Sequence, residues 1–118
     1  MILTGSYDCC LKLWDIRKIY QEVEELNTGR QIWDVKFNEQ QGLYKFAIAG
    51  VYDGYQFGQE INKQAPFSLG NIKIDLFLEH KDICYASEFV FSKEGVADKV
   101  LTSSFYDSNL KLVEIKSN

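Results

Sequence analysis

Few side chains in this 118-residue chain could act as a nucleophile or a base: one histidine, His80, and three cysteines, Cys9, Cys10 and Cys84. Hydrolysis needs an activated nucleophile or an activated water molecule, together with hydrogen-bond donors aimed at the developing oxyanion. His80 is a candidate base, and the alternative is a structural histidine hydrogen-bonded within the fold. Cys84 is a candidate nucleophile only beside a cation that lowers its pKa, and the alternative is a buried apolar cysteine.

Recognised catalytic motifs are absent from the sequence. It contains no Gly-x-Ser-x-Gly elbow, no His-Glu-x-x-His, no spaced Cys/His metal set and no glycine-rich phosphate loop. We therefore predict no metal and no cofactor, and the catalytic residues stay unassigned. What the sequence does define are the elements that would position a site.

A short pattern recurs along the chain. Residues 2–16 predict two strands joined by a polar turn and closed by Trp14-Asp15. Residues 100–115 repeat this pattern with one extra residue before the turn, and residues 47–54 repeat its first half. A period of about 40 to 45 residues with a Trp-Asp signature is typical of a propeller blade. The chain thus resembles the WD-repeat family.

This resemblance implies an all-β fold, a partial WD-repeat β-propeller of roughly two and a half four-stranded antiparallel blades out of seven. Residues 1–29 would form an incomplete blade without its innermost strand, 30–79 a complete blade, and 80–118 a last blade without its outer strand. A seven-bladed ring needs about 300 residues. We therefore expect a C-terminal fragment or truncated gene product that is inactive alone and exposes unpaired edges.

Alternating apolar and polar residues predict the individual strands. The expected strands are 2–4, 11–14, 19–26, 32–37, 45–50, 55–59, 71–78, 83–91, 99–103 and 110–115. Residues 62–70, which contain Pro66, are expected to form a loop.

In WD-repeat blades, a set of hydrogen-bonded side chains links the strands to the preceding loop. The resemblance implies such a set in each blade of this chain, and we call it a structural tie. Ser6, Asp8 and Trp14 match three members of that set in the first repeat. In the last repeat the matching residues are His80, Ser104 and Asp107. The second repeat has Gln59 where the first has Trp14, so its tie is weakened.

Charge and composition exclude several kinds of partner. The net charge is −4, and no cluster of Lys or Arg exceeds the Arg17-Lys18 pair, so neither nucleic acid nor an acidic membrane is predicted. No run of 18 apolar residues predicts a membrane span. Three cysteines, an odd number, fit reduced thiols in a cytoplasmic protein.

Less common segments point to one branch of the family. The segments are Gly5 to Asp8, Leu13 to Arg17, Gly29 to Phe37, His80 to Phe89 and Ser104 to Asp107. In this order they resemble the C-terminal blades of the diphthine methyl ester hydrolases of the diphthamide pathway. That resemblance implies hydrolysis of a methyl ester on a modified histidine of elongation factor 2. Val113-Glu114, Cys9 and Ser108 depart from the family pattern.

One face of such a fold would carry two kinds of loop: the segments that lead into the innermost strand of each blade, and the turns that contain an aspartate. The residues expected there to contact a partner protein are Arg30, Trp33, Tyr52, Asp53, Asp82, Tyr85 and Tyr106. Aromatic residues and arginine commonly anchor protein interfaces. For Trp33 and Tyr85 the alternative is a place in the core. The alternative for the whole protein is a non-catalytic WD-repeat scaffold.

Overall fold

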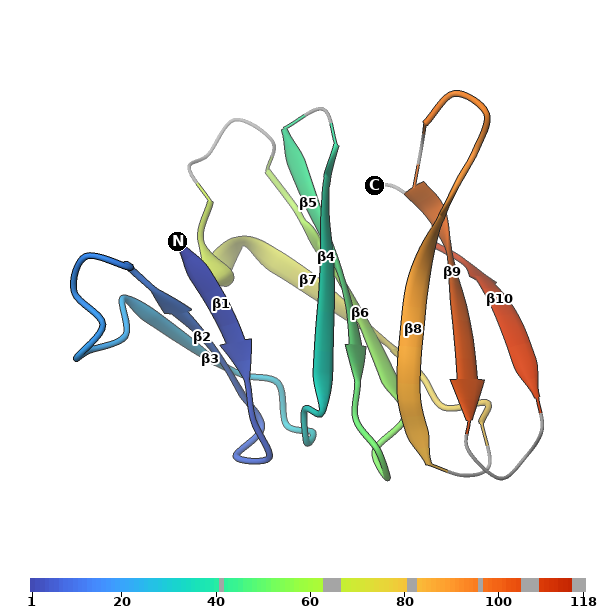
Figure 1. Ribbon diagram of the computed structural model, residues 1–118, viewed down its shortest axis with the longest axis horizontal. Coiled ribbons are helices and arrows are strands. Elements are labelled where there is room, and N and C mark those ends of the chain that lie inside the picture. The colour runs from blue at the N-terminus through green and yellow to red at the C-terminus, as the bar shows by residue number, and fades with distance from the viewer. Residues whose placement is uncertain (41, 63–66, 81–82, 96, 105–108, 116–118) are drawn as a thin grey trace.

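The computed structural model describes the chain except residues 41, 63–66, 81–82, 96, 105–108 and 116–118 (Figure 1). The described residues form ten strands and one short 3-10 helix, η1. In chain order these are β1 Ile2–Gly5, β2 Cys10–Trp14, β3 Glu24–Asn27, β4 Asp34–Gln40, β5 Leu43–Ala49, β6 Tyr55–Glu60, η1 Leu69–Asn71, β7 Ile72–Phe77, β8 Cys84–Phe91, β9 Ala97–Ser104 and β10 Leu110–Glu114.

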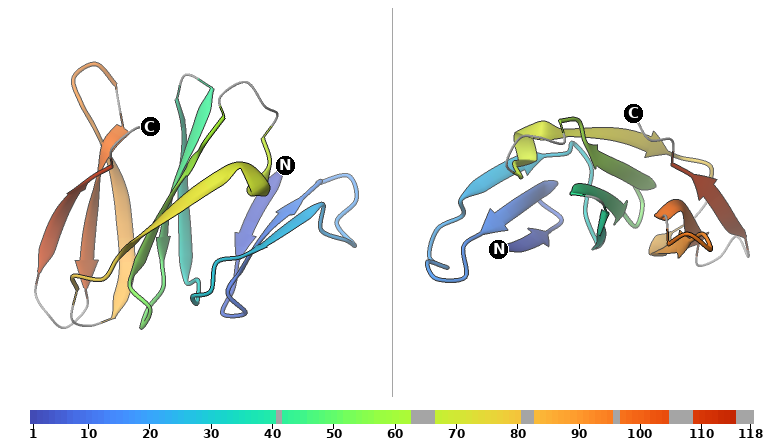
Figure 2. Two further views of the ribbon diagram at one scale, coloured as in Figure 1. Left: turned by 180° about the vertical axis from the view of Figure 1, so that it is seen from behind. Right: turned by 90° about the horizontal axis from the view of Figure 1, so that it is seen from above.

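The strands form three antiparallel sheets, in the orders β1-β2-β3, β4-β5-β6-β7 and β10-β9-β8. This confirms the all-β prediction. The sheets stand side by side in chain order and follow an arc (Figure 2). Strands β1, β4 and β8 lie along one side of the arc, and β4 contacts both β1 and β8. The three sheets thus pack face to face in sequence order.

The core lies in the two spaces between neighbouring sheets. Leu11, Leu13 and Ile48 belong to the cluster between the first and second sheets. Ala47 and Ala49 belong to the cluster between the second and third sheets. Because successive side chains of a strand point to opposite faces, β5 contributes to both clusters and is apolar at nearly every position. The central strands of the middle sheet, β5 and β6, are therefore largely buried on both faces.

Two expected strand starts were wrong, and a 3-10 helix begins in an expected loop. The strand predicted over 19–26 covers only Glu24–Asn27, and Ile19 and Tyr20 are 67% and 82% exposed. Its partner β2 is only five residues long, and pairing ends at Leu13 opposite Glu24. The strand predicted from residue 32 begins at Asp34, and η1 starts within the loop predicted over 62–70. The length of the partner strand determines where pairing ends. The local alternation of apolar and polar residues does not encode that length.

One end of the sheets carries the turns that the sequence places on a common face. The turn at 6–9, the segment 28–33 that enters β4, and the turn at 50–54 all lie at the lower end in Figure 1. Cys9 and Val51 adopt φ values of 70° and 52° in the two turns. These left-handed conformations reverse the chain within a few residues.

Candidate functional site

A row of three aromatic side chains lies at this end of the molecule. Tyr7 follows β1, Trp33 precedes β4, and Tyr85 belongs to β8, so each ring comes from a different sheet or its flanking segment. The ring centroids of Tyr7 and Trp33 are 6.0 Å apart, and those of Trp33 and Tyr85 are 5.5 Å apart. The exposed fractions are 49%, 55% and 36%. We call these three residues the aromatic row.

Backbone hydrogen bonds between neighbouring sheets hold the row in place. The amide of Ile32 donates to the carbonyl of Ser6 at 3.1 Å, directly beside Trp33 and Tyr7. The amide of Cys84 donates to the carbonyl of Val51 at 2.7 Å, one residue before Tyr85. Two such bonds fix the chain positions from which the rings project. The row is therefore a product of how the sheets are joined.

Arg30 and Asp53, two of the predicted contact residues, lie together, but both are engaged within the fold. The Asp53 carboxylate accepts a hydrogen bond from the amide of Gln31 at 2.8 Å. The Arg30 guanidinium donates to the carbonyl of Asp53 at 3.1 Å. Tyr52, in the same turn, is 76% exposed. This pair therefore anchors the segment leading to Trp33.

Two predicted contact residues, Asp82 and Tyr106, lie outside the described residues, as does Asp107. Tyr7, in contrast, was missed by the sequence reasoning although it belongs to the row. The repeat itself contains the signal for it, because Tyr7 precedes Asp8 as Tyr52 precedes Asp53. Of this pair only Tyr52 was selected.

His80 is buried and takes part in a contact between elements. Its Nε2 atom lies 2.9 Å from the hydroxyl of Thr102 in β9, and its ring packs against Tyr55 and Phe77. A base must reach the proton that it abstracts, and this ring is 9% exposed. The geometry suits a structural tie between β7 and the third sheet.

The thiols also lack the surroundings of a nucleophile. Cys84 is 1% exposed, and its backbone forms an isolated bridge with Val51. A hydrogen bond with Glu25, followed by burial, raises the pKa of Cys10 from 9.0 to about 11. Neutral pH therefore leaves Cys10 protonated, whereas a reactive cysteine needs a lowered pKa.

The tie predicted for the first repeat uses a different hydroxyl. Trp14 Nε1 donates to Thr4 Oγ1 at 2.8 Å, so Thr4 occupies the place expected for Ser6. The Asp8 carboxylate accepts from the amide of Cys10 at 3.0 Å. Ser104, predicted as a tie in the last repeat, has a buried hydroxyl oxygen with no hydrogen-bond partner among the described residues.

An exposed ion pair follows the first tie. Arg17 contacts the carboxylate of Asp15 at 2.7 Å. Hydrogen bonds from Arg17 hold the pKa of the Asp15 carboxyl below its usual range, and the same contact raises the pKa of Arg17. Both residues stay charged at neutral pH. They lie beyond β2, away from the turn that carries Tyr7.

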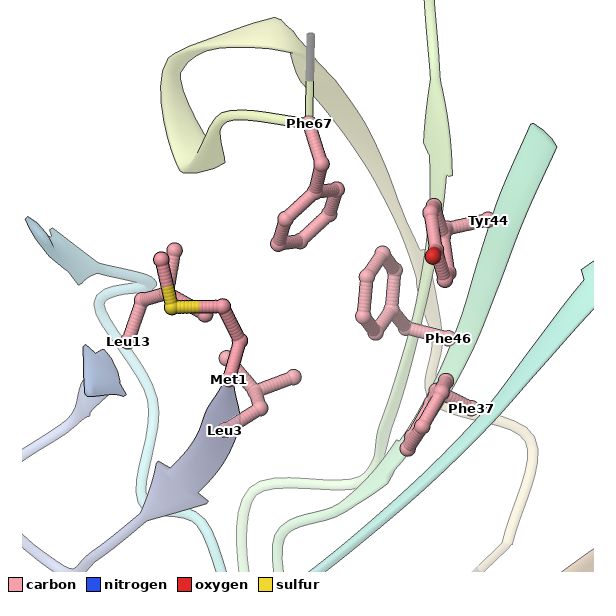
Figure 3. Close-up of a pocket in the computed structure, with 7 residues that line it drawn as sticks. All are labelled: Met1, Leu3, Leu13, Phe37, Tyr44, Phe46 and Phe67. Carbon is pink, nitrogen blue, oxygen red and sulfur yellow. The ribbon is translucent and has the colours of Figure 1, made fainter. Parts of the chain in front are cut away.

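A separate apolar cavity of about 360 Å³ lies between the first and second sheets (Figure 3). Phe67 packs against Tyr44 there, with ring centroids 4.8 Å apart. Its lining is Met1, Leu3, Leu13, Phe37, Tyr44, Phe46 and Phe67. It lies toward the β4–β5 end of the sheets, opposite the aromatic row, and its apolar lining does not suit hydrolytic chemistry.

Among the described residues, no group of three or more His, Cys, Asp or Glu side chains is placed to hold a metal ion. The same part of the chain has no helix long and apolar enough to cross a bilayer.

Comparison with known proteins gives one informative similarity. No protein family description and no solved structure matches the chain. In an alignment that covers 95% of this chain, the sequence is 29% identical to a Dictyostelium discoideum protein named "Diphthine methyltransferase homolog". The chain spans 31% of the length of that relative. The sequence is thus distantly homologous to part of a protein whose name refers to diphthine.

Proposed function

We propose that this chain is part of a WD-repeat propeller that acts in the diphthamide pathway. The three sheets would be blades of that propeller. The intact protein would hydrolyse the methyl ester of the modified histidine on elongation factor 2, in the cytoplasm. The similarity to the Dictyostelium protein, which extends over nearly the whole chain, is the observation that carries the proposal.

The aromatic row supports a docking role for this part of the protein. Three exposed rings from successive sheets meet on the face that carries the turns, and a protein ligand there would contact all three. Loops on a rigid β scaffold commonly carry binding residues. We assign the docking of elongation factor 2 to this face and leave the nucleophile unassigned.

The test is a gene deletion followed by mass spectrometry of elongation factor 2. Loss of the protein should leave the methyl ester on the modified histidine, and the intact gene should remove it. Purified protein from the intact gene should also release methanol from the methylated factor. A factor without accumulated ester after the deletion would exclude the hydrolase.

A non-catalytic scaffold is the second candidate. It is favoured by the burial of His80 and Cys84 and by the raised pKa of Cys10, none of which prepares a group for catalysis. A scaffold would bind the factor through the same face without releasing methanol. The methanol assay with purified protein therefore separates the two candidates.

A further inference from the structure

The apolar cavity between the first and second sheets is large enough to hold a small ligand. We propose that it binds a small neutral aromatic molecule of two fused rings, a proposal that does not depend on the hydrolase assigned above. The cavity volume is about 360 Å³. Ligand pockets in proteins start at about 300 Å³ and are mostly apolar. An apolar cavity of about 150 Å³ already holds benzene, so this space suits two fused rings better than one.

The two walls of the cavity differ in chemistry (Figure 3). The first sheet and the residue before it supply an aliphatic wall, and the second sheet with the connection between β6 and β7 supplies an aromatic wall. The aliphatic wall is Met1, Leu3 and Leu13, and the aromatic wall is Phe37, Tyr44, Phe46 and Phe67. Leu13 and Phe46 are 3% and 1% exposed, whereas Met1 and Phe37 are 73% and 60% exposed. The cavity therefore has a buried floor and opens to solvent beside Met1 and Phe37.

The aromatic wall favours an aromatic ligand over an aliphatic one. The ring centroids of Tyr44 and Phe67 are 4.8 Å apart, and those of Phe46 and Phe67 are 6.1 Å apart. Phe37 lies 6.5 Å from Phe46 by the same measure. Aromatic rings attract one another at centroid distances of about 4.5–7 Å, beyond what burial alone supplies. A planar ligand in the gap would add one more ring to this group, and an aliphatic ligand would not.

Hydrogen bonds from the first sheet hold the segment that carries Phe67. The carboxylate of Glu24 in β3 accepts from the hydroxyl of Ser68 at 3.0 Å and from the amide of Leu69 at 2.7 Å. Leu69 is 2% exposed and belongs to the core cluster between the same two sheets. These contacts fix the residues next to Phe67 in the absence of a ligand. Binding therefore does not have to order this wall, which lowers the cost of association.

The lining favours a ligand without charge. Among the described residues that line the cavity, none has a charged side chain. Lys45, between Tyr44 and Phe46 in β5, points to the opposite face of the strand, because successive side chains alternate. An ion that leaves water for apolar surroundings without a partner loses its hydration at a large cost in free energy. A charged analogue of the ligand should therefore bind weakly.

The experiment titrates the chain, labelled with ¹³C at the methyl groups of Met and Leu, with indole and follows the methyl signals by NMR. The signals of Met1, Leu3 and Leu13 should shift saturably, with an apparent Kd of about 0.1–1 mM. Leu112, which is 58% exposed on β10, should not respond and is an internal control. Two analogues should bind at least severalfold more weakly: indole-3-carboxylate, an anion with the same rings, and 1-adamantanol, a neutral molecule of similar size without an aromatic ring.

Variants locate the site. Leu3→Trp places an indole ring of the protein itself in the cavity and should abolish the binding of free indole. Leu112→Trp is the matched control, because it adds the same ring at an exposed leucine of another sheet, and it should bind as the parent does. Phe67→Leu removes one ring of the aromatic wall and should weaken binding by about two- to tenfold. The amide spectrum of each variant establishes that it is folded.

Any of three results would overturn the proposal: no saturable shift of the cavity methyl signals, equal affinity for indole and either analogue, or unchanged indole binding by both folded variants, Leu3→Trp and Phe67→Leu. None of these measurements involves ester hydrolysis or the aromatic row. Indole bound in the cavity of a protein that releases no methanol would therefore refute the hydrolase and leave the cavity site standing.

Discussion

At the scale of single residues, two threonines make comparable hydrogen bonds in different surroundings. Thr4 accepts from the indole of Trp14 in an exposed setting, whereas Thr102 is fully buried beside His80. In the second repeat, Ala49 stands where the first repeat has Thr4, and Gln59 stands where it has Trp14. The middle repeat thus lacks both the hydroxyl and the indole of this hydrogen bond.

Replacing each threonine by valine should reveal the difference. Thr4→Val should lower the free energy of unfolding by about 0.5–1.5 kcal/mol, because water can solvate the released indole N–H. Thr102→Val should lower it by about 1–3 kcal/mol, because it leaves the buried His80 ring without this partner. Urea denaturation measures both. Equal costs would contradict the contrast in burial.

The three thiols should differ in reactivity. Cys9 is partly exposed, Cys10 is 7% exposed with a pKa raised to about 11, and Cys84 is 1% exposed. Iodoacetamide at pH 8 should modify Cys9 first in the native protein, as located by peptide mass spectrometry. Rapid labelling of Cys10 would contradict the raised pKa.

The raised pKa of Cys10 determines how the stability of the fold depends on pH. The folded state keeps the Cys10 proton above its ordinary pKa of 9.0, so the unfolded chain loses that proton first. The contribution of Cys10 to stability is therefore complete below pH 9 and declines as the pH rises from about 9 toward about 11. Denaturation of a Cys10→Ala variant, compared with the parent across this range, isolates the effect.

At the scale of elements, Tyr55 links the second sheet to the third. Its hydroxyl lies 2.5 Å from the carbonyl of Ala86 and 2.6 Å from that of Ser103, which are paired across β8 and β9. Tyr55→Phe keeps the ring and removes this link. It should cost about 1–3 kcal/mol in the free energy of unfolding. Hydrogen exchange should show the largest loss of protection in β6 and β8. A neutral substitution would contradict the link.

Two glycines with nearly the same backbone conformation provide another matched pair. Gly29 and Gly54 have φ values of 78° and 77°. A Cβ at Gly29 would meet nothing within 4 Å, whereas one at Gly54 would lie 2.6 Å from Leu78 Cδ2 and 3.0 Å from the carbonyl oxygen of Phe77.

Gly29→Ala should therefore cost about 1–2 kcal/mol for the left-handed backbone alone. Gly54→Ala should cost about 1–3 kcal/mol more, because the methyl group also displaces neighbouring atoms. Thermal or chemical denaturation of both variants measures the difference. Indistinguishable stabilities would show that the close contact at Gly54 relaxes freely.

Much of the strand pattern could be predicted from the sequence, because apolar and polar residues alternate with a period of two in segments such as Leu11 to Trp14. The start of β3 could not, since the length of β2 determines it. The link made by Tyr55 could not either, because its partners are 31 and 48 residues away along the chain. Local patterns determine strands, whereas packing determines their ends and cross-links.

At the scale of the whole molecule, the placement of sheets creates the candidate site. Trp33 and Tyr85 were expected on one face, but their contact with each other and with Tyr7 depends on the spacing between sheets. No single repeat contains that spacing. The apolar cavity at the opposite end arises in the same way, between two sheets whose facing residues do not fill the space.

We propose that the aromatic row docks the protein substrate of a methyl ester hydrolase. The most direct measurement is methanol release from methylated elongation factor 2 by protein from the intact gene, with Trp33→Leu compared with Tyr20→Leu. We predict that Trp33→Leu raises KM by about tenfold or more while Tyr20→Leu, at an exposed tyrosine between β2 and β3, leaves it unchanged. Equal activity of the two variants, or no methanol from the parent protein, would contradict the account.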